Sequence, residues 1–155
     1  MILIIVGFKS IKAQDQISFA RLTIDEGLSQ NAVFCIIQDR HGFIWAGTED
    51  GLNKYDGYKF SIYKHENSNP STLSNSQINA LHEDKYGNLW IGTSDGLNIF
   101  NREKETFTRI NTRANKISEA TDFITCLFQD SRNNLWIGTT EGLKRFDYKT
   151  KKVSP

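Results

Sequence analysis

The sequence has no excess of either charge and no long hydrophobic run. Its 19 lysines and arginines and 18 acidic residues are mixed along the chain and give a net charge of +1, so no basic stripe is available to hold phosphates. We therefore expect no nucleic-acid partner. The almost wholly apolar stretch at residues 1–8 is too short to cross a bilayer as a helix, which needs about 20 residues.

Cysteine is also scarce, and the two cysteines occupy equivalent places. Cys35 and Cys126 each stand four residues before a recurring aspartate, where the middle copy of the pattern has Ala80. Equivalent positions in non-adjacent units lie outside disulfide range. The alanine in the middle copy indicates a small buried slot. We therefore expect two structural thiols and no bridge, which says little about the redox compartment.

Residue patterns typical of catalysis or metal binding are missing as well. His41, His65 and His82 occupy three different places in the pattern and have no metal-ligand spacing. His82 stands at a strand position that holds Ile37 and Phe128 in the other copies, so we interpret it as a half-buried histidine that is bonded locally. No serine or threonine lies in a nucleophile-elbow pattern or beside a recognisable base. We expect no catalytic residues, no metal and no other cofactor.

What the sequence does contain is a pattern that occurs three times. Leu-Trp-Ile-Gly-Thr stands at 89–93 and at 135–139, and Ile-Trp-Ala-Gly-Thr at 44–48. The tryptophans are 45 and 46 positions apart, and a fixed period of this length marks a repeat architecture. In the same register, an aspartate precedes each tryptophan by six residues and a glycine follows it by six. The recurring residues are Trp45, Trp90 and Trp136; Asp39, Asp84 and Asp130; and Gly51, Gly96 and Gly142.

Each unit predicts four short strands and no helix. It opens with an apolar run rich in β-branched and aromatic residues, which is typical of a strand covered on both sides. A polar turn follows, and its position held by Gly42, Gly87 and Asn133 predicts a positive φ. The tryptophan strand, a Thr-x-[Asp/Glu]-Gly hairpin turn and two further strands complete the unit. Four antiparallel strands in about 45 residues form one blade of a β-propeller.

We therefore predict an all-β fold, an incomplete β-propeller of about three four-stranded antiparallel blades plus an N-terminal closing strand. The closing strand is inferred because residues 19–22 resemble the fourth-strand patterns at 60–63 and 107–110. Propellers usually have about 4 to 8 blades, so we expect this chain to be the front of a longer protein. The predicted boundaries are an N-terminal outer strand at 14–27, blade 1 at 28–72, blade 2 at 73–116 and an incomplete blade 3 at 117–155.

The first 13 residues carry the evidence for localisation. Residues 1–8 are almost wholly apolar, and Ala13 stands where a signal peptidase requires a small residue. The segment 1–13 resembles a truncated secretory signal peptide whose basic first part is missing, which predicts export to the periplasm. A short tail or a buried first strand stays open as the alternative, since the charged start and an Ala-x-Ala ending are absent.

The run from Asp39 to Asp56, with Gly-Leu-Ser at 27–29 before it, resembles the two-component regulator propeller repeat. The second and third copies match as well, and Asn133 in place of the turn glycine is the main departure. The resemblance covers residues 17 to about 150. It implies the periplasmic sensor region of a hybrid two-component system of the Bacteroidetes type, many of which detect oligosaccharides. The kinase, receiver and DNA-binding regions of such proteins are not in this sequence, so no kinase activity carries over.

The recurring residues favour structural roles over chemical ones. Each tryptophan lies mid-strand among apolar neighbours, so we interpret it as inter-blade core rather than as a sugar-stacking platform. Each aspartate begins a tight turn, where a carboxylate accepts local backbone N–H bonds. The less repetitive connections, 64–77 and 111–122, share a face with the Thr-x-[Asp/Glu]-Gly turns. Their candidate ligand-binding residues are Asn67, Asn69, Arg113 and Asn115, with an ordinary solvated loop as the alternative.

These observations predict a non-catalytic periplasmic ligand-sensing propeller module, tethered to the inner membrane in its intact parent. The resemblance implies an oligosaccharide ligand, with the remaining blades and the signalling domains as partners. Two alternatives stay open: a protein-interaction scaffold, and a polysaccharide-acting enzyme with paired carboxylates at the channel mouth. Asp50, Asp95 and Glu141 recur on the loop face, but hairpin geometry explains them first. Because three blades cannot close a ring, we also expect the isolated chain to self-associate.

Overall fold

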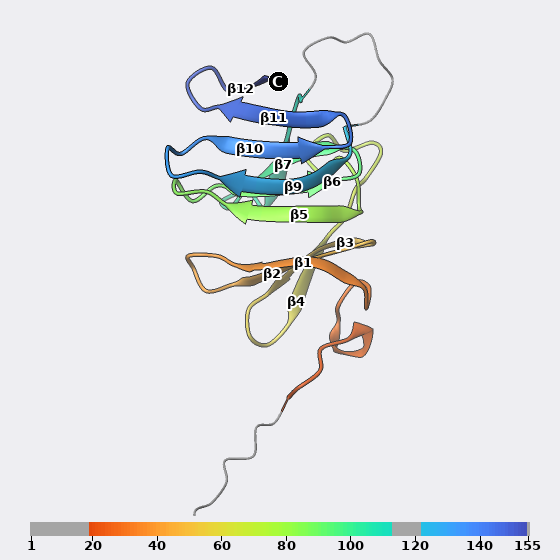
Figure 1. The fold of residues 1–155 in the computed structure, drawn as a ribbon. Coiled ribbons are helices and arrows are strands. Elements are labelled where there is room, and N and C mark those ends of the chain that lie inside the picture. Colours follow the sequence, from red (N-terminus) through yellow and green to blue (C-terminus); the bar gives the residue numbers. More distant parts are fainter. Residues whose placement is uncertain (1–18, 113–121, 155) are drawn as a thin grey trace, which may run out of the picture.

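A computed structural model describes residues 19–112 and 122–154 and contains three four-stranded antiparallel sheets (Figure 1). In each sheet, strands that follow one another in the sequence lie side by side. The first sheet holds β1 (Val33–Gln38), β2 (Ile44–Thr48), β3 (Gly51–Tyr55) and β4 (Phe60–Tyr63). The second holds β5 (Ile78–Glu83), β6 (Leu89–Thr93), β7 (Gly96–Asn101) and β8 (Thr106–Ile110). The third holds β9 (Ile124–Gln129), β10 (Leu135–Thr139), β11 (Gly142–Asp147) and β12 (Lys152–Ser154).

The three sheets are stacked as successive propeller blades, which confirms the predicted all-β class. Their first strands β1, β5 and β9 run next to one another, with β5 in contact with both others (Figure 1). The turn position that predicted a positive φ has it in every blade: 87° at Gly42, 89° at Gly87 and 67° at Asn133. These turns join the first and second strands of each blade, so the sequence period fixes the same hairpin three times.

Apolar residues are buried between blades rather than within them. Trp45 and Leu52 of blade 1 pack against Leu89, Ile91 and Phe100 of blade 2 in one cluster. A second cluster joins blade 2 to blade 3 and contains Trp90, Leu97, Ile124, Leu135, Ile137 and Phe146. Blade 2 therefore buries both faces of its sheet, as expected when a repeat unit buries its apolar surface only against a neighbour.

The glycine of the Trp-x-Gly-Thr pattern marks a close approach between blades. A Cβ atom on Gly47 would lie 2.7 Å from Cγ2 of Ile78, and one on Gly92 would lie 2.5 Å from Cγ2 of Ile124. Real Cβ atoms do not come so near to a carbon atom. Only glycine therefore allows the first strand of the next blade to pack at this distance.

The predicted N-terminal closing strand is not formed in the described part of its segment. Residues 19–23 lie in no strand, and Ile24–Glu26 forms the short 3-10 helix η1. Thr23 and Glu26 close a capping box, in which the Thr23 N–H donates to Glu26 Oε2 at 2.6 Å. A closing strand pairs with the edge of another blade, and residues 19–27 belong to none of the three described sheets.

Two further expectations differ from the structure. Blade 3, predicted to be incomplete, has all four strands, because β12 pairs with β11 through Phe146 and Val153. Both cysteines were expected to be buried in a small slot, and neither is fully buried. Cys35 is half-buried, and Cys126 is exposed on the face of blade 3 that points away from blade 2. The predicted leader at 1–13 lies outside the described residues. No helix in the described part of the chain is long and apolar enough to span a membrane.

Candidate functional site

The recurring aspartates bind their own blade in two ways. Asp39 Oδ1 accepts backbone N–H bonds from His41 and Phe43 at 2.9 and 3.0 Å, which holds the β1–β2 turn. Its other oxygen, Oδ2, accepts the indole N–H of Trp45 at 2.8 Å. The same indole bonds join Trp90 to Asp84 at 2.8 Å and Trp136 to Asp130 at 3.0 Å. The constant six-residue spacing therefore satisfies the one polar group of each core tryptophan.

The same carboxylates also bind the following blade. Arg102 Nη1 of blade 2 donates to Asp39 Oδ2 at 2.7 Å, and the Tyr148 hydroxyl of blade 3 donates to Asp84 Oδ2 at 3.0 Å. Arg102 and Tyr148 occupy equivalent places, twelve residues after the tryptophan of their own blade. We call each such contact an aspartate link. Gly57 stands at this place in blade 1, so that blade has no side-chain donor there.

Hydrogen bonding keeps these carboxylates ionised. Burial acts to raise the pKa of Asp39, but the bonds from Trp45 and Arg102 outweigh it and leave the pKa below the ordinary value. The pKa of Asp84 is lowered against burial in the same way. Bonds from Asn134 and Trp136 lower the pKa of Asp130 to about 2. A general acid at neutral pH needs a raised pKa, so these aspartates are suited to holding blades together and not to proton transfer.

The turns that follow Asp39 and Asp84 make a second contact between blades. The Arg40 N–H donates to Glu83 Oε2 of blade 2 at 2.8 Å, and the Arg40 guanidinium bonds Glu83 Oε1 at 3.1 Å. In the next interface, the Lys85 N–H donates to Gln129 Oε1 of blade 3 at 2.9 Å. Both contacts lie on the face of the propeller that carries the first turn of each blade, which we call the turn face.

The opposite face, which we call the loop face, carries the Thr-x-[Asp/Glu]-Gly turns and the long connections between blades. Asn53 is fully buried there: its Nδ2 donates to Ser29 Oγ at 2.8 Å and its Oδ1 accepts the Ser29 N–H at 2.9 Å. Asn98 and Ser74 repeat this pair in blade 2. In blade 3 the position belongs to Lys144, whose Nζ lies 2.9 Å from the buried Asp122 carboxylate.

These loop anchors were not predicted from the sequence. Asn53 and Asn98 stand eight residues after their tryptophans, and this regular spacing is the signal that could have identified them. The replacement by Lys144 in the third copy conceals the pattern, because a lysine pairs with a carboxylate rather than with a serine.

The predicted ligand-binding residues fall partly on the described loop face. Asn67 is exposed, and its Oδ1 lies 2.8 Å from Nε2 of His65. Asn69 is half-buried, and its Oδ1 accepts the Ser71 N–H at 3.0 Å. Arg109 of β8 donates to the Asn69 carbonyl at 3.2 Å and fixes the loop against blade 2. The other two candidates, Arg113 and Asn115, lie outside the described residues.

A groove of about 200 Å³ runs beside this loop where blades 1 and 2 meet. Its polar lining includes Lys64, Glu66, Asn69, Thr72 and Glu105. Positively charged, negatively charged and hydroxyl side chains lie close together here on a scaffold of strands, which suits hydrogen bonding to a polar ligand. Among the described residues, no group of three histidine, cysteine, aspartate or glutamate side chains could hold a metal ion.

Asp50 and His82, which the sequence analysis considered as possible functional residues, have local roles. Asp50 begins the β2–β3 hairpin turn, where its N–H donates to Thr48 Oγ1 at 3.1 Å and its carboxylate pairs with Lys64 at 2.7 Å. His82 is half-buried as expected, but the expected local bond is not made: its Nε2 is buried without a hydrogen-bond partner. Burial lowers the pKa of His82, which favours a neutral ring.

The sequence model of the two-component regulator propeller family matches the chain three times, at residues 27–50, 72–95 and 118–141, once in each blade. The chain belongs to the two-component regulator propeller family. This repeat accounts for the features found above, because each matched segment runs from the loop-face connection through the aspartate and tryptophan to the Thr-x-[Asp/Glu]-Gly turn.

Proteins similar to this two-component regulator propeller chain come from bacterial signalling systems. The extracellular domain of BT3049, assigned to a hybrid two-component system of B. thetaiotaomicron, is 32% identical with a TM-score of 0.78 over 88% of this chain. The extracellular domain of BT4673 from the same organism is 26% identical with a TM-score of 0.66 over 83% of this chain. Histidine kinase P4 of Formosa agariphila is 44% identical over 66 residues, or 42% of this chain.

The two-component regulator propeller chain covers only a small share of these relatives. It spans 20% of the BT3049 domain, 17% of the BT4673 domain and 5% of histidine kinase P4. A streptogramin B lyase also matches, at 18% identity and a TM-score of 0.60 over 79% of this chain and 39% of the lyase. That likeness shows a shared propeller fold and nothing about chemistry.

Proposed function

We propose that this chain is part of the periplasmic ligand-sensing propeller of a two-component signalling protein. The observation that carries the proposal is the similarity to the extracellular domain of BT3049 over 88% of this chain. The match to histidine kinase P4 agrees with it. Signal output through a kinase would belong to the intact parent, together with the remaining blades and an inner-membrane tether.

The chemistry of the described residues supports binding rather than catalysis. The three recurring aspartates are ionised and bonded to tryptophan indoles, so they are committed to structure. The polar groove beside the 64–77 loop instead offers hydrogen-bonding groups at fixed positions. We propose an oligosaccharide as the ligand, because hydroxyl-rich molecules match such a lining, with Asn67, Asn69, Arg113 and Asn115 as its contacts.

A ligand screen by isothermal titration calorimetry tests this function. We expect at least one oligosaccharide to bind saturably, and Asn67→Ala with Asn69→Ala to weaken that binding. Lys104→Ala, an exposed change on the turn face, is the control and should leave the affinity unchanged. A thermal melt of each variant establishes that the loop change has not unfolded the blade.

Other outcomes of the screen separate the alternatives. Binding of a protein and of no saccharide would favour the interaction scaffold. Cleavage of an added polysaccharide would favour an enzyme. Export is tested by fractionating cells that carry a full-length reporter fusion, which should appear in the periplasm after processing before Gln14; an unprocessed cytosolic product would contradict the periplasmic location.

A further inference from the structure

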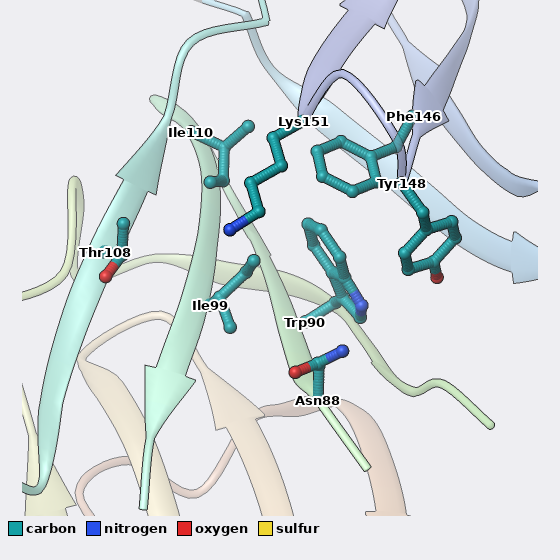
Figure 2. A pocket seen from close by; sticks show the side chains of 8 residues that line it. All are labelled: Asn88, Trp90, Ile99, Thr108, Ile110, Phe146, Tyr148 and Lys151. Atoms are coloured by element: carbon teal, nitrogen blue, oxygen red, sulfur yellow. The ribbon is translucent and has the colours of Figure 1, made fainter. Parts of the chain in front are cut away.

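The repeat gives both inter-blade spaces the same eight positions, so the two spaces can be compared directly. Between blades 2 and 3, these positions surround a cavity of about 280 Å³. Its lining, drawn in Figure 2, is Asn88, Trp90, Ile99, Thr108, Ile110, Phe146, Tyr148 and Lys151. Strand register and sequence spacing place Phe43, Trp45, Lys54, Ser61, Tyr63, Phe100, Arg102 and Glu105 at the equivalent positions between blades 1 and 2.

Large side chains occupy the space between blades 1 and 2. The Tyr63 ring centroid lies 6.1 Å from that of Trp45 and 5.4 Å from that of Phe100. Lys54 Nζ lies 4.3 Å from the centroid of the Phe43 ring. Between blades 2 and 3, smaller residues stand in place of Tyr63, Lys54 and Phe43, and they leave the cavity open. These residues are Ile110, Ile99 and Asn88.

The two spaces also differ in charge. Glu105 and Lys151 occupy the same turn position, with φ of 51° and 54°. The Glu105 carboxylate accepts the Tyr63 hydroxyl at 3.1 Å and lies 3.6 Å from Lys54 Nζ. Lys151 has the opposite charge, and in Figure 2 its side chain faces Ile99 and Ile110. Among the described residues, no carboxylate or other acceptor pairs with Lys151 Nζ.

We propose that the cavity between blades 2 and 3 binds a small organic acid. Its carboxylate would pair with the Lys151 ammonium, as the Glu105 carboxylate pairs with Lys54 in the first space. Its apolar body would pack on Trp90, Ile99 and Phe146, which line the cavity. A volume of about 280 Å³ lies at the small end of ligand pockets, roughly 300 to 1,000 Å³, so the acid carries one ring or a short branched chain.

This site is separate from the proposed oligosaccharide groove. The cavity lies between blades 2 and 3, whereas the groove beside Asn69 lies where blades 1 and 2 meet. The two sites have no lining residue in common. Either site can therefore fail its test without affecting the other.

Binding of phenylacetate to the full chain tests the proposal, with its neutral analogue phenylacetamide for comparison. Ligand-observed NMR titrations should show saturable binding of phenylacetate. Phenylacetamide should bind at least about tenfold more weakly, because it cannot form the charged pair. Equal affinities for the two probes, or no saturable binding of phenylacetate, would overturn the proposal.

Three variants test whether phenylacetate binds in the cavity between blades 2 and 3. Lys151→Met keeps the length of the side chain and should weaken phenylacetate binding at least about tenfold. Lys149→Met changes a lysine in the same turn that does not line the cavity, and it should leave binding unchanged. Ile110→Tyr, which introduces the residue of the first space, should abolish binding in a chain that still melts cooperatively. If Lys151→Met has no effect on phenylacetate binding, the assigned site is incorrect, whether or not the Ile110→Tyr variant folds.

Discussion

At the scale of single residues, each tryptophan has an apolar role and a polar role together. Trp90 is 1% exposed, its ring lies 4.7 Å from that of Phe146, and its N–H bonds Asp84. Trp136 has the same bond to Asp130 but is only partly buried, since no described blade covers its outer side. Trp90 and Trp136 therefore make the same hydrogen bond and differ mainly in how much of the ring is packed.

Trp90→Ala should lower the free energy of unfolding by ~3–5 kcal/mol, the range for removing a large buried aromatic side chain. Trp136→Ala is the matched variant and should cost clearly less, because less of its ring is packed. Urea unfolding followed by circular dichroism measures both values. Equal losses in the two variants would show that inter-blade packing does not set the cost.

Acid should also destabilise the chain through the aspartate links. The pKa values of Asp39 and Asp84 are lower in the folded state than the ordinary value, so both groups contribute fully above about pH 4. Their contribution is lost as the pH falls from about 4 through the folded-state pKa of each group. Unfolding in urea at a series of pH values should show this decrease.

Asp84→Asn supplies the comparison for the acid titration. The amide removes the titrating group at the link between blades 2 and 3, so the variant should be less stable near neutral pH and should lose less stability in acid. Parallel pH profiles for the variant and the parent chain would contradict a contribution from this carboxylate.

At the scale of elements, close packing of β6 on β9 depends on a glycine. Gly92→Ala would bring its Cβ to 2.5 Å from Cγ2 of Ile124, and overpacking of this kind costs ~1–3 kcal/mol. Ile124→Ala removes the nearest opposing atom, Cγ2, keeps Cβ at 2.9 Å, and leaves a void. The double variant should therefore lose less stability than the sum of the two single variants. Strict additivity in thermal or urea melts would mean that the blades move apart freely.

The strands and turns were predictable because their signals recur in one register. The Asp-to-Trp spacing placed the hairpins, and Gly42 and Asn133 revealed the positive-φ position even though the residue differs. The donors of the aspartate links were missed, because Arg102 and Tyr148 have no obvious likeness and only the register shows that they are equivalent. The cavity was missed for a similar reason: it arises from size differences across two spaces, which no single motif contains.

The N-terminal segment shows a second limit of sequence patterns. Residues 19–22 have the composition of a fourth strand, but a strand is defined by its partner as well as by its own residues. In the described structure the capping box of Thr23 and Glu26 satisfies the backbone locally, and residues 19–27 pair with no strand. Tertiary context, and not propensity, therefore decides its conformation.

At the scale of the whole molecule, both outer faces of the stack expose apolar side chains. Phe34 and Ile36 of blade 1 are 50% and 64% exposed, and Phe128 and Leu143 of blade 3 are 63% and 60% exposed. In a longer protein, further blades would cover these faces. Alone, such surfaces favour association.

We therefore predict that isolated residues 14–155 self-associate in analytical ultracentrifugation. Ile36→Lys combined with Phe128→Lys should shift the chain toward monomer, because a charge on each sheet face opposes its burial. Tyr58→Lys is the control: Tyr58 is 95% exposed in a turn, away from the sheet faces, and its replacement should change little. A parent chain that sediments as a single monomer and melts sharply would contradict the prediction.

The aspartate links also make the stack directional. In each link, the donor belongs to one blade and the acceptor to the blade before it. The free energy of a link therefore depends only on two neighbouring blades, and each added blade stabilises the blade before it. Blade 1 has Gly57 at the donor place and cannot supply this link. In any ring that closes through blade 1, that joint lacks the link which stiffens the two described joints. The ring then has one seam of lower cohesion, and opening or twisting under load would begin there.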